Sequence, residues 1–237
     1  MTATSSRPSD GRRRALLVID TATSRVVAGV ASPDGALEGL TTWQAGHRHG
    51  ETLLPAIGRL LGEANLRRSR LAGVIVGTGP GAFTGLRVGI ATAKGVARGL
   101  GVPIVGVSTS TALATALSAR DGIAAERIVV LLPAGPSDRV MCRLGDPPRL
   151  LVGDTGVDVG PADVVCAVDL EGRSPVDAVE RGERARDGLG RALANIGARR
   201  LAAGDADDLA TLVPEYVTLP RGVRTAMDEV AWSRGHP

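Results

Sequence analysis

The amino-acid sequence predicts a two-lobed α/β protein with a mixed sheet. Three apolar segments joined by short turns come first, and helical and strand-like segments then alternate along the chain. With 237 residues, the chain has room for one large domain or two small lobes. A chain of this size buries roughly 70–75% of its extended surface, so its core needs no metal or disulfide.

The first three segments have the pattern of an antiparallel meander. Residues 15–19 (ALLVI) form a short apolar run that stops at Asp20. Residues 25–31 and 36–43 follow, separated by the turn sequence SPDG at 32–35. Because short turns join neighbouring antiparallel strands, we expect these three segments to pair in sequence order.

A helical repeat then replaces the strand pattern. Apolar residues recur every three to four positions over 50–65 and 85–100, with a continuous apolar strand at 71–77 between them. A strand at 103–107 and a helix capped by Ser108 follow. A meander followed by α/β crossovers is typical of the ribonuclease-H-like fold, which is also the repeated lobe of the actin/Hsp70/sugar-kinase (ASKHA) ATPases.

The second half of the sequence is less regular. We predict an exposed charged segment at 171–188, a helix at 188–200, and strands at 127–132, 139–144, 150–152 and 164–168. The predicted organisation is a disordered tail at 1–14, a first lobe at 15–110 and a second, smaller α/β lobe at 111–237. We expect the C-terminal 20 residues to pack back on the first lobe.

The charge distribution separates the tail from the body. The net charge is +3, and the first 14 residues account for it with four arginines and one aspartate: Arg7, Arg12, Arg13, Arg14 and Asp10. Within the neutral body, residues 41–120 are basic and residues 121–237 are acidic. The basic face is either simply solvated or available to an acidic partner or to phosphates. Four aromatic residues are too few for a platform that stacks single-stranded nucleic acid.

The cysteines and the hydropathy indicate a cytoplasmic location. Cys142 and Cys166 have no zinc-ligand spacing, so we expect two free thiols in a reducing compartment. No apolar run has the roughly 18 residues of a membrane span, so we expect no membrane association.

A glycine-rich loop at 77–85 (GTGPGAFTG) lies between a predicted strand and a predicted helix. It resembles a phosphate cradle, but it lacks the lysine of the P-loop and the spacing of the dinucleotide fingerprint. Asp20, Gly79 and Gly81 are therefore weak candidates for a cofactor site. The alternatives are a tight structural turn for the loop and a hairpin anchor for Asp20.

The sequence assigns no catalytic or metal-binding residue. His47, His49 and Glu51 form an HxHxE pattern, but residues two positions apart do not share a helix face. A ribonuclease-H-type nuclease needs several converging acids, and the segments at 71–77 and 85–100 contain none. With three histidines in the chain, no Ser-His-Asp or Cys-His set is credible.

The helices at 50–65 and 85–100 each have a surplus apolar or small-residue face. One apolar stripe suffices to seat a helix on a sheet. Interior glycine costs about 1 kcal/mol relative to alanine, so several glycines indicate close approach of another helix, from this chain or from a partner. The predicted partner-binding residues are Leu54, Leu61, Val88, Gly89, Thr92, Gly95, Val96 and Gly99.

Several motifs together resemble the TsaB (YeaZ) family. They are IDTAT at 19–23, HGETLLP at 49–55, GPGAFTGLRVG at 79–89, VGVST at 105–109, PEYV at 214–217 and VAW at 230–232. The resemblance is dense over 15–110 and thin beyond it. Residues 133–142 (PAGPSDRVMC) depart from the Asp-Ala-Arg-like segment that such chains usually carry there.

The resemblance implies an ATPase-like fold without ATPase chemistry. TsaB-like chains are non-catalytic partners of TsaD, which transfers a threonylcarbamoyl group to adenosine in tRNAs that read codons starting with A. It implies docking on a TsaD-like enzyme through the first-lobe helices, a TsaE-like ATPase as a further partner, and tRNA contact only through the complex. A homodimer in isolation, and a nucleotide bound only in the complex, are further expectations. The alternatives are an ATP-dependent small-molecule kinase or ATPase of the same fold, and a metallopeptidase-like protein.

Overall fold

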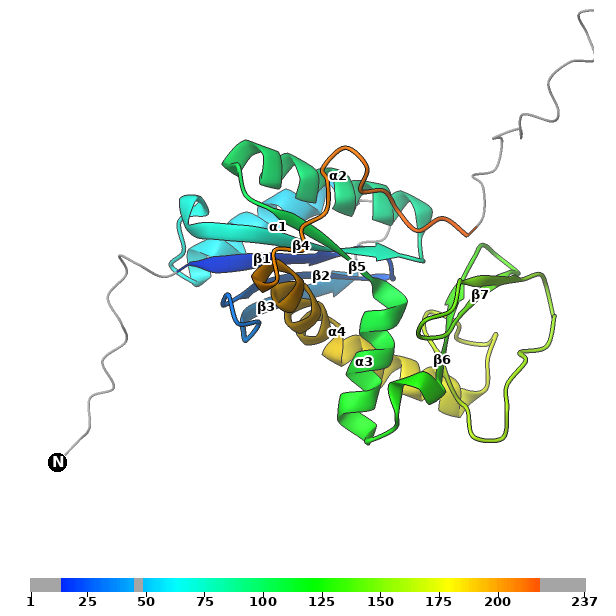
Figure 1. Cartoon of the computed structure of the whole chain (residues 1–237). Helices are drawn as coiled ribbons and strands as arrows, with labels where there is room; N and C mark the ends of the chain where they lie inside the picture. Colours follow the sequence, from blue (N-terminus) through cyan, green and yellow to red (C-terminus); the bar gives the residue numbers. More distant parts are fainter. Residues whose placement is uncertain (1–13, 45–48, 218–237) are drawn as a thin grey trace, which may run out of the picture.

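The structure, a computed structural model, describes residues 14–44 and 49–217 (Figure 1). Its strands form a five-stranded sheet in the order β3-β2-β1-β4-β5 and a four-stranded sheet in the order β8-β7-β6-β9. The predicted tail lies outside the described residues except for Arg14, and so do the C-terminal 20 residues, whose packing we predicted.

The five-stranded sheet has the predicted topology. Strands β1 (Ala15–Asp20), β2 (Arg25–Ala31) and β3 (Leu37–Gln44) pair antiparallel in sequence order. Strands β4 (Leu71–Gly79) and β5 (Ile104–Ser108) continue the sheet parallel to β1. This arrangement confirms the ribonuclease-H-like fold class. β1 is buried along its whole length because it lies at the centre of the sheet and is covered on both faces.

Two helices cover one face of this sheet. They are α1 (His49–Glu63) and α2 (Phe83–Leu100), which lie side by side above the strands in Figure 1. Their core-facing side chains join the apolar residues on the upper face of β1, β2 and β4 in one cluster. Helix α2 ends at Gly101, whose left-handed φ of 64° lets its N–H bond back to the last turn. The short 3-10 helix η1 (Arg68–Arg70) connects α1 to β4.

The four-stranded sheet forms the second lobe. Its strands are β6 (Ile128–Pro133), β7 (Arg139–Cys142), β8 (Arg149–Leu151) and β9 (Val164–Ala167), preceded by the 3-10 helix η2 (Ala125–Arg127). Each coincides with a predicted strand to within two residues at either end. β6 lies between β7, which is antiparallel to it, and β9, which is parallel.

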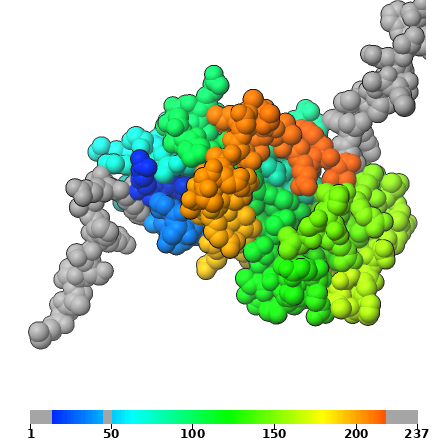
Figure 2. Space-filling model, in the orientation of Figure 1, coloured from blue at the N-terminus to red at the C-terminus, as the bar shows by residue number. Residues whose placement is uncertain are grey.

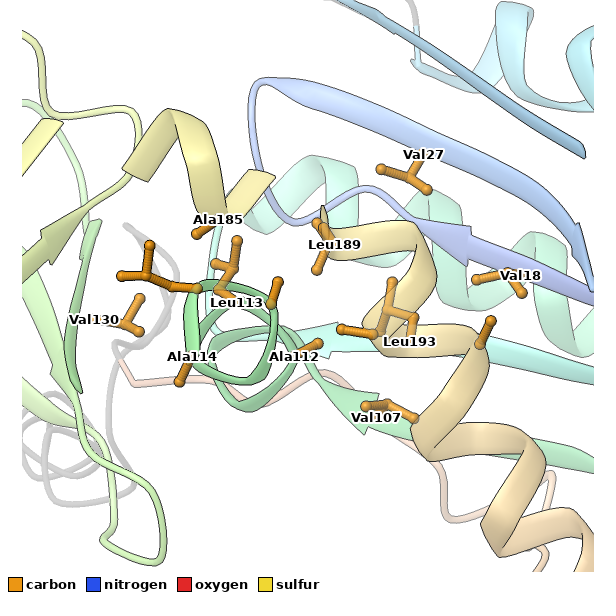
Figure 3. Packing of buried hydrophobic residues seen from close by; sticks show 14 of the residues in the cluster. Val18, Val27, Val107, Ala112, Leu113, Ala114, Val130, Ala185, Leu189 and Leu193 are labelled. Atoms are coloured by element: carbon orange, nitrogen blue, oxygen red, sulfur yellow. The ribbon is translucent and has the colours of Figure 1, made fainter. Parts of the chain in front are cut away.

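One long helix connects the two sheets. α4 (Val176–Ala202) packs against β9 near its start and against the underside of the first sheet near its end, with α3 (Thr109–Asp121) beside it (Figure 1). In Figure 3, Leu189 and Leu193 of α4 point between α3 and the strands that carry Val18 and Val27. At 1.5 Å per residue its 27 residues reach about 40 Å, enough to serve both sheets.

The prediction of an exposed charged segment at 171–188 was wrong. α4 begins at Val176, and its first turns bury Ala178, Gly182 and Ala185 on one face. A Cβ at Gly182 would overlap the carbonyl oxygen of Ala167, so the helix axis lies very close to β9. Among the charged residues of these turns, Glu180 is exposed, Arg181, Glu183 and Arg184 are half-buried, and Arg186 is buried. Small residues bury a helix by close approach and leave little apolar signal in the sequence.

After α4 the chain returns to the first sheet. Residues 203–217, which we call the return segment, run past the free edge of β5 and then along α2; Figure 2 shows them as a continuous orange band on the surface. Asp207 makes a bridge with Ile104, and its Oδ2 accepts the Gly106 N–H at 2.7 Å. Further along, the Glu215 N–H donates to the Thr78 carbonyl at 2.8 Å. The return segment therefore covers the edge strand β5.

Candidate partner interface and the cluster around Asp20

Asp20, the last residue of β1, lies in a closed hydrogen-bond cluster. Its side chain is fully buried. Oδ1 accepts the Ala22 N–H at 2.9 Å, and Oδ2 accepts the Thr109 hydroxyl at 2.7 Å. Thr109 Oγ1 in turn accepts the Gly79 N–H at 3.1 Å. Burial raises the pKa of Asp20 to about 6, and the two hydrogen bonds partly oppose the rise.

The glycines of the loop at 77–85 are explained by this cluster. A Cβ at Gly77 would overlap Oδ2 of Asp20, and a Cβ at Gly81 would overlap the Ala22 carbonyl. The same carbonyl accepts the Ala82 N–H at 2.7 Å, while Thr21 Oγ1 donates to the Gly85 carbonyl at 2.8 Å. The loop thus packs directly on the β1–β2 turn.

The structure brings Asp20, Gly79 and Gly81 together, as the weak cofactor prediction required. The Ala22 N–H and the Thr109 hydroxyl both donate to the Asp20 carboxylate, so protein groups satisfy this carboxylate. The geometry fits the alternative interpretation, in which Asp20 anchors the hairpin and the loop is a tight turn against it.

A second polar cluster follows β5. Ser108 Oγ donates to Glu215 Oε2 at 3.3 Å and lies 3.0 Å from Ser110 Oγ. Burial raises the pKa of Glu215. The sequence analysis missed this contact between residues 107 positions apart, because nothing in the sequence indicates that the return segment reaches the end of β5.

The nearby hollow is small. Its volume is about 10 Å³, which is room for about one water molecule, and it is lined by Ser110, Thr111, Ala114, Val130, Cys142, Arg143 and Leu144. Small-molecule sites typically begin at roughly 300 Å³. Burial raises the pKa of the Cys142 thiol to about 12. Cys142 and Cys166 are buried free thiols, as predicted.

The outer faces of α1 and α2 hold most of the predicted partner-binding residues. Leu54 is 57% exposed. Gly95 and Gly99 are exposed, and within the described part of the chain a Cβ at either position would meet no atom within 4 Å beyond the helix's own backbone. Val88, Thr92 and Val96 are half-buried along the same helix.

Two of the predicted residues face the protein's own core instead. Leu61 is only 4% exposed and belongs to the apolar cluster under α1. The buried face of α1 is therefore wider than one apolar stripe. Gly89 is buried, and a Cβ there would overlap Thr21 Oγ1. The expectation that Gly89 points away from the core was wrong, because the first half of α2 rests on the β1–β2 turn.

The sequence analysis missed two further open glycines on α1. Gly58 and Gly62 are exposed, and among residues 14–44 and 49–217 only the backbone of α1 itself lies within 4 Å of the position of a Cβ. They are four residues apart, like Gly95 and Gly99 on α2, so each pair lies on one side of its helix. Their signal in the sequence was the same small-residue spacing that singled out α2.

An aromatic cluster marks the beginning of α2. The rings of Phe83 and Tyr216 are 5.3 Å apart. The Arg87 guanidinium lies 3.9 Å from the centroid of the Phe83 ring, and its Nε donates to the Tyr216 hydroxyl at 3.0 Å. The return segment is thereby held on α2, and Tyr216 remains 42% exposed.

The structure describes only part of the HxHxE pattern formed by His47, His49 and Glu51. His47 lies outside the described residues, and α1 begins at His49. Over residues 14–44 and 49–217, no three His, Cys, Asp or Glu side chains gather closely enough to hold a metal ion. Among the described helices, none combines the length and the apolar character that a membrane span requires.

These features define a ribonuclease-H-like α/β protein whose β1–β2 turn is closed by its own side chains. Residues 36–158, just over half of the chain, match the family model described as TsaD, tRNA N6-adenosine threonylcarbamoyltransferase. The chain belongs to this family.

The resemblance to TsaB (YeaZ) is also confirmed. TsaB of Haemophilus influenzae is 38% identical over 68 residues, which are 29% of each chain. The structure of YeaZ from Pseudomonas aeruginosa aligns with a TM-score of 0.68 and 22% identity, covering 86% of this chain and all of that one, so the two share a fold. An uncharacterized protein of Mycobacterium leprae is 43% identical over 102 residues, 41% of this chain and 28% of the relative. The chain thus spans less than half the length of the curated relatives it matches.

Proposed function

We propose that the chain is a non-catalytic subunit that docks on a TsaD-like enzyme and supports threonylcarbamoylation of adenosine in tRNAs that read codons starting with A. The observation that carries this proposal is the open face of α1 and α2. Each of its four exposed glycines destabilises its helix relative to alanine. No close packing within the described part of the chain requires a glycine at these positions.

The geometry of this face suits a partner helix. Without side chains at Gly58, Gly62, Gly95 and Gly99, another helix can approach the two backbones closely. Leu54 adds exposed apolar area beside them, and burying a leucine fully contributes roughly 1.5–3 kcal/mol.

The proposed assembly has further members. A TsaE-like ATPase joins the TsaD-like enzyme and this chain, and nucleotide binds only in that complex. In isolation, the same open face pairs two copies of the chain into a homodimer. The closed cluster around Asp20 supports a role without phosphate chemistry, since the carboxylate is already satisfied by protein donors.

The test is a pull-down of the TsaD-like enzyme by wild type and by Gly95→Arg. The substitution places a long charged side chain on the open face, where a Cβ would meet no described atom within 4 Å apart from the backbone of α2 itself. We expect partner binding to fall at least tenfold while the melting temperature does not drop below that of wild type, because the position is exposed and arginine favours a helix more than glycine does.

Ala119→Arg on α3 is the matched control, since it adds the same side chain at an exposed helical position elsewhere. It should bind the partner like wild type. Undiminished binding by a folded Gly95→Arg variant would place the interface elsewhere. ATP hydrolysis by the purified chain alone would favour the kinase or ATPase alternative.

A further inference from the structure

We propose that the edge of the first sheet where β1 and β4 begin binds the phosphate backbone of RNA. The described residues of this surface are Arg14, Arg67, Arg68 and Arg98, and we call it the arginine edge. The proposal rests on the proposed function in one respect, which is that the RNA is the tRNA modified by the TsaD-like partner.

The topology brings these residues to one end of the sheet. Ala15, the first residue of β1, is paired with Leu71, the first residue of β4. Arg14 therefore lies beside the end of η1, and Arg67 and Arg68 precede that end by a few residues. Neighbouring strands are about 4.8 Å apart, so the two arginine-bearing segments adjoin.

Helix α2 ends at the same edge. α1 and α2 both run toward the starts of β4 and β5, because each leads into the next parallel strand (Figure 1, left). Arg98 lies in the last turn of α2 and is exposed. Glu63, at the end of α1, is the acid closest in sequence to Arg67 and Arg68.

The arginines of this edge differ from those around α4. Arg25, Arg120, Arg181, Arg184, Arg186 and Arg200 each form an ion pair with an aspartate or glutamate. Arg14, Arg67, Arg68 and Arg98 are exposed and form no ion pair within the described part of the chain. Their guanidinium groups are thus free to take an external anion, and guanidinium binds phosphate with paired hydrogen bonds.

The adjoining sequence extends the same charge. In the sequence, Arg12 and Arg13 directly precede Arg14, and Arg7 lies five residues before Arg12. The four exposed arginines of the described edge suit a polyanion better than the rim of a protein interface, where charges of both signs alternate. The shortage of aromatic residues favours contact with phosphates over base stacking.

The experiment measures the binding of unmodified tRNA to the full chain by fluorescence anisotropy over a salt series. The test variant is Arg67→Glu/Arg68→Glu. The matched control is Arg149→Glu/Arg191→Glu, which reverses two other exposed arginines without ion pairs in the described chain, on β8 and α4. Both variants change the net charge equally.

We expect wild-type affinity to fall steeply with salt, and to be weak at physiological salt without the partner. At about 50 mM salt the test variant should bind at least tenfold more weakly, with the log–log salt slope reduced by about one per arginine. The control should stay within twofold of wild type, and both variants should melt like wild type.

Several results would overturn the proposal. One is equal loss of RNA binding in the test variant and the control, which would indicate a nonspecific charge effect. Another is unchanged RNA binding in the test variant. If that variant instead loses binding to vesicles containing phosphatidylserine, or to the TsaD-like partner, the arginine edge binds that ligand and not RNA. The two proposals can fail separately. Gly95→Arg should lose binding to the TsaD-like partner and keep RNA binding, whereas Arg67→Glu/Arg68→Glu should lose RNA binding and keep binding to the partner.

Discussion

The glycines of the β4–α2 loop and those on the outer faces of α1 and α2 belong to the same lobe but have opposite surroundings. At Gly77, Gly81 and Gly89 a Cβ would overlap atoms of the β1–β2 turn. At Gly58 and Gly95 it would meet nothing within 4 Å. The first group allows two segments of this chain to touch, whereas the second leaves a face without an occupant. The same residue type thus indicates internal packing in one place and a proposed docking surface in the other.

The largest effect is expected from Gly77→Ala. The new methyl group would overlap the buried carboxylate of Asp20, whose neighbours are fixed by hydrogen bonds. Forcing extra volume into such a site should lower the free energy of unfolding by about 3 kcal/mol. For a chain of this size, the melting temperature should then fall by roughly 6–12 °C. A melting temperature equal to that of wild type would show that the cluster is loosely packed.

The next effect concerns the pH dependence of stability. Burial raises the pKa of Asp20 from 3.8 to about 6. A carboxyl group with a higher pKa in the folded chain stabilises folding most when protonated. Its contribution is complete below pH 4 and is lost as the pH rises through about 6, a change of about 3 kcal/mol.

Asp20→Asn removes this titration. We expect the free energy of unfolding of wild type, relative to the variant, to decrease between pH 4 and 7 in denaturant titrations. Surface aspartates with lowered pKa values, such as Asp205 beside Arg200, act at lower pH and in the opposite direction in both proteins. Parallel pH profiles for the two proteins would contradict the raised pKa that burial gives Asp20.

The smallest effect is expected at Gly95, on the open face of α2. Gly95→Ala should raise the free energy of unfolding by roughly 0.5–1 kcal/mol, because alanine favours a helix and the position has space for its methyl group. The same methyl group should weaken binding of the TsaD-like partner severalfold if a helix approaches there. A variant that is destabilised in isolation would show that the face is already covered.

Much of the first lobe could be predicted from the sequence because its signals are local. Short turns specified the pairing of β1, β2 and β3, and the change to helical periodicity located α1 and α2. The second lobe shows the limit of such signals. α4 starts 12 residues before the predicted helix, because its first turns bury alanine and glycine among charged residues.

The sequence by itself determined the pairing of β1, β2 and β3, the ribonuclease-H-like class and the two helices with surplus faces, since these depend on neighbouring residues and short connections. Only the tertiary structure decided which way each glycine faces. A residue without a side chain has no polarity by which the sequence could orient it, so Gly89 and Gly95 looked alike. The structure also separated Arg181, Arg184, Arg186 and Arg200 of α4, which have acidic partners, from the residues of the arginine edge, because ion pairing depends on side-chain contacts that the sequence does not show.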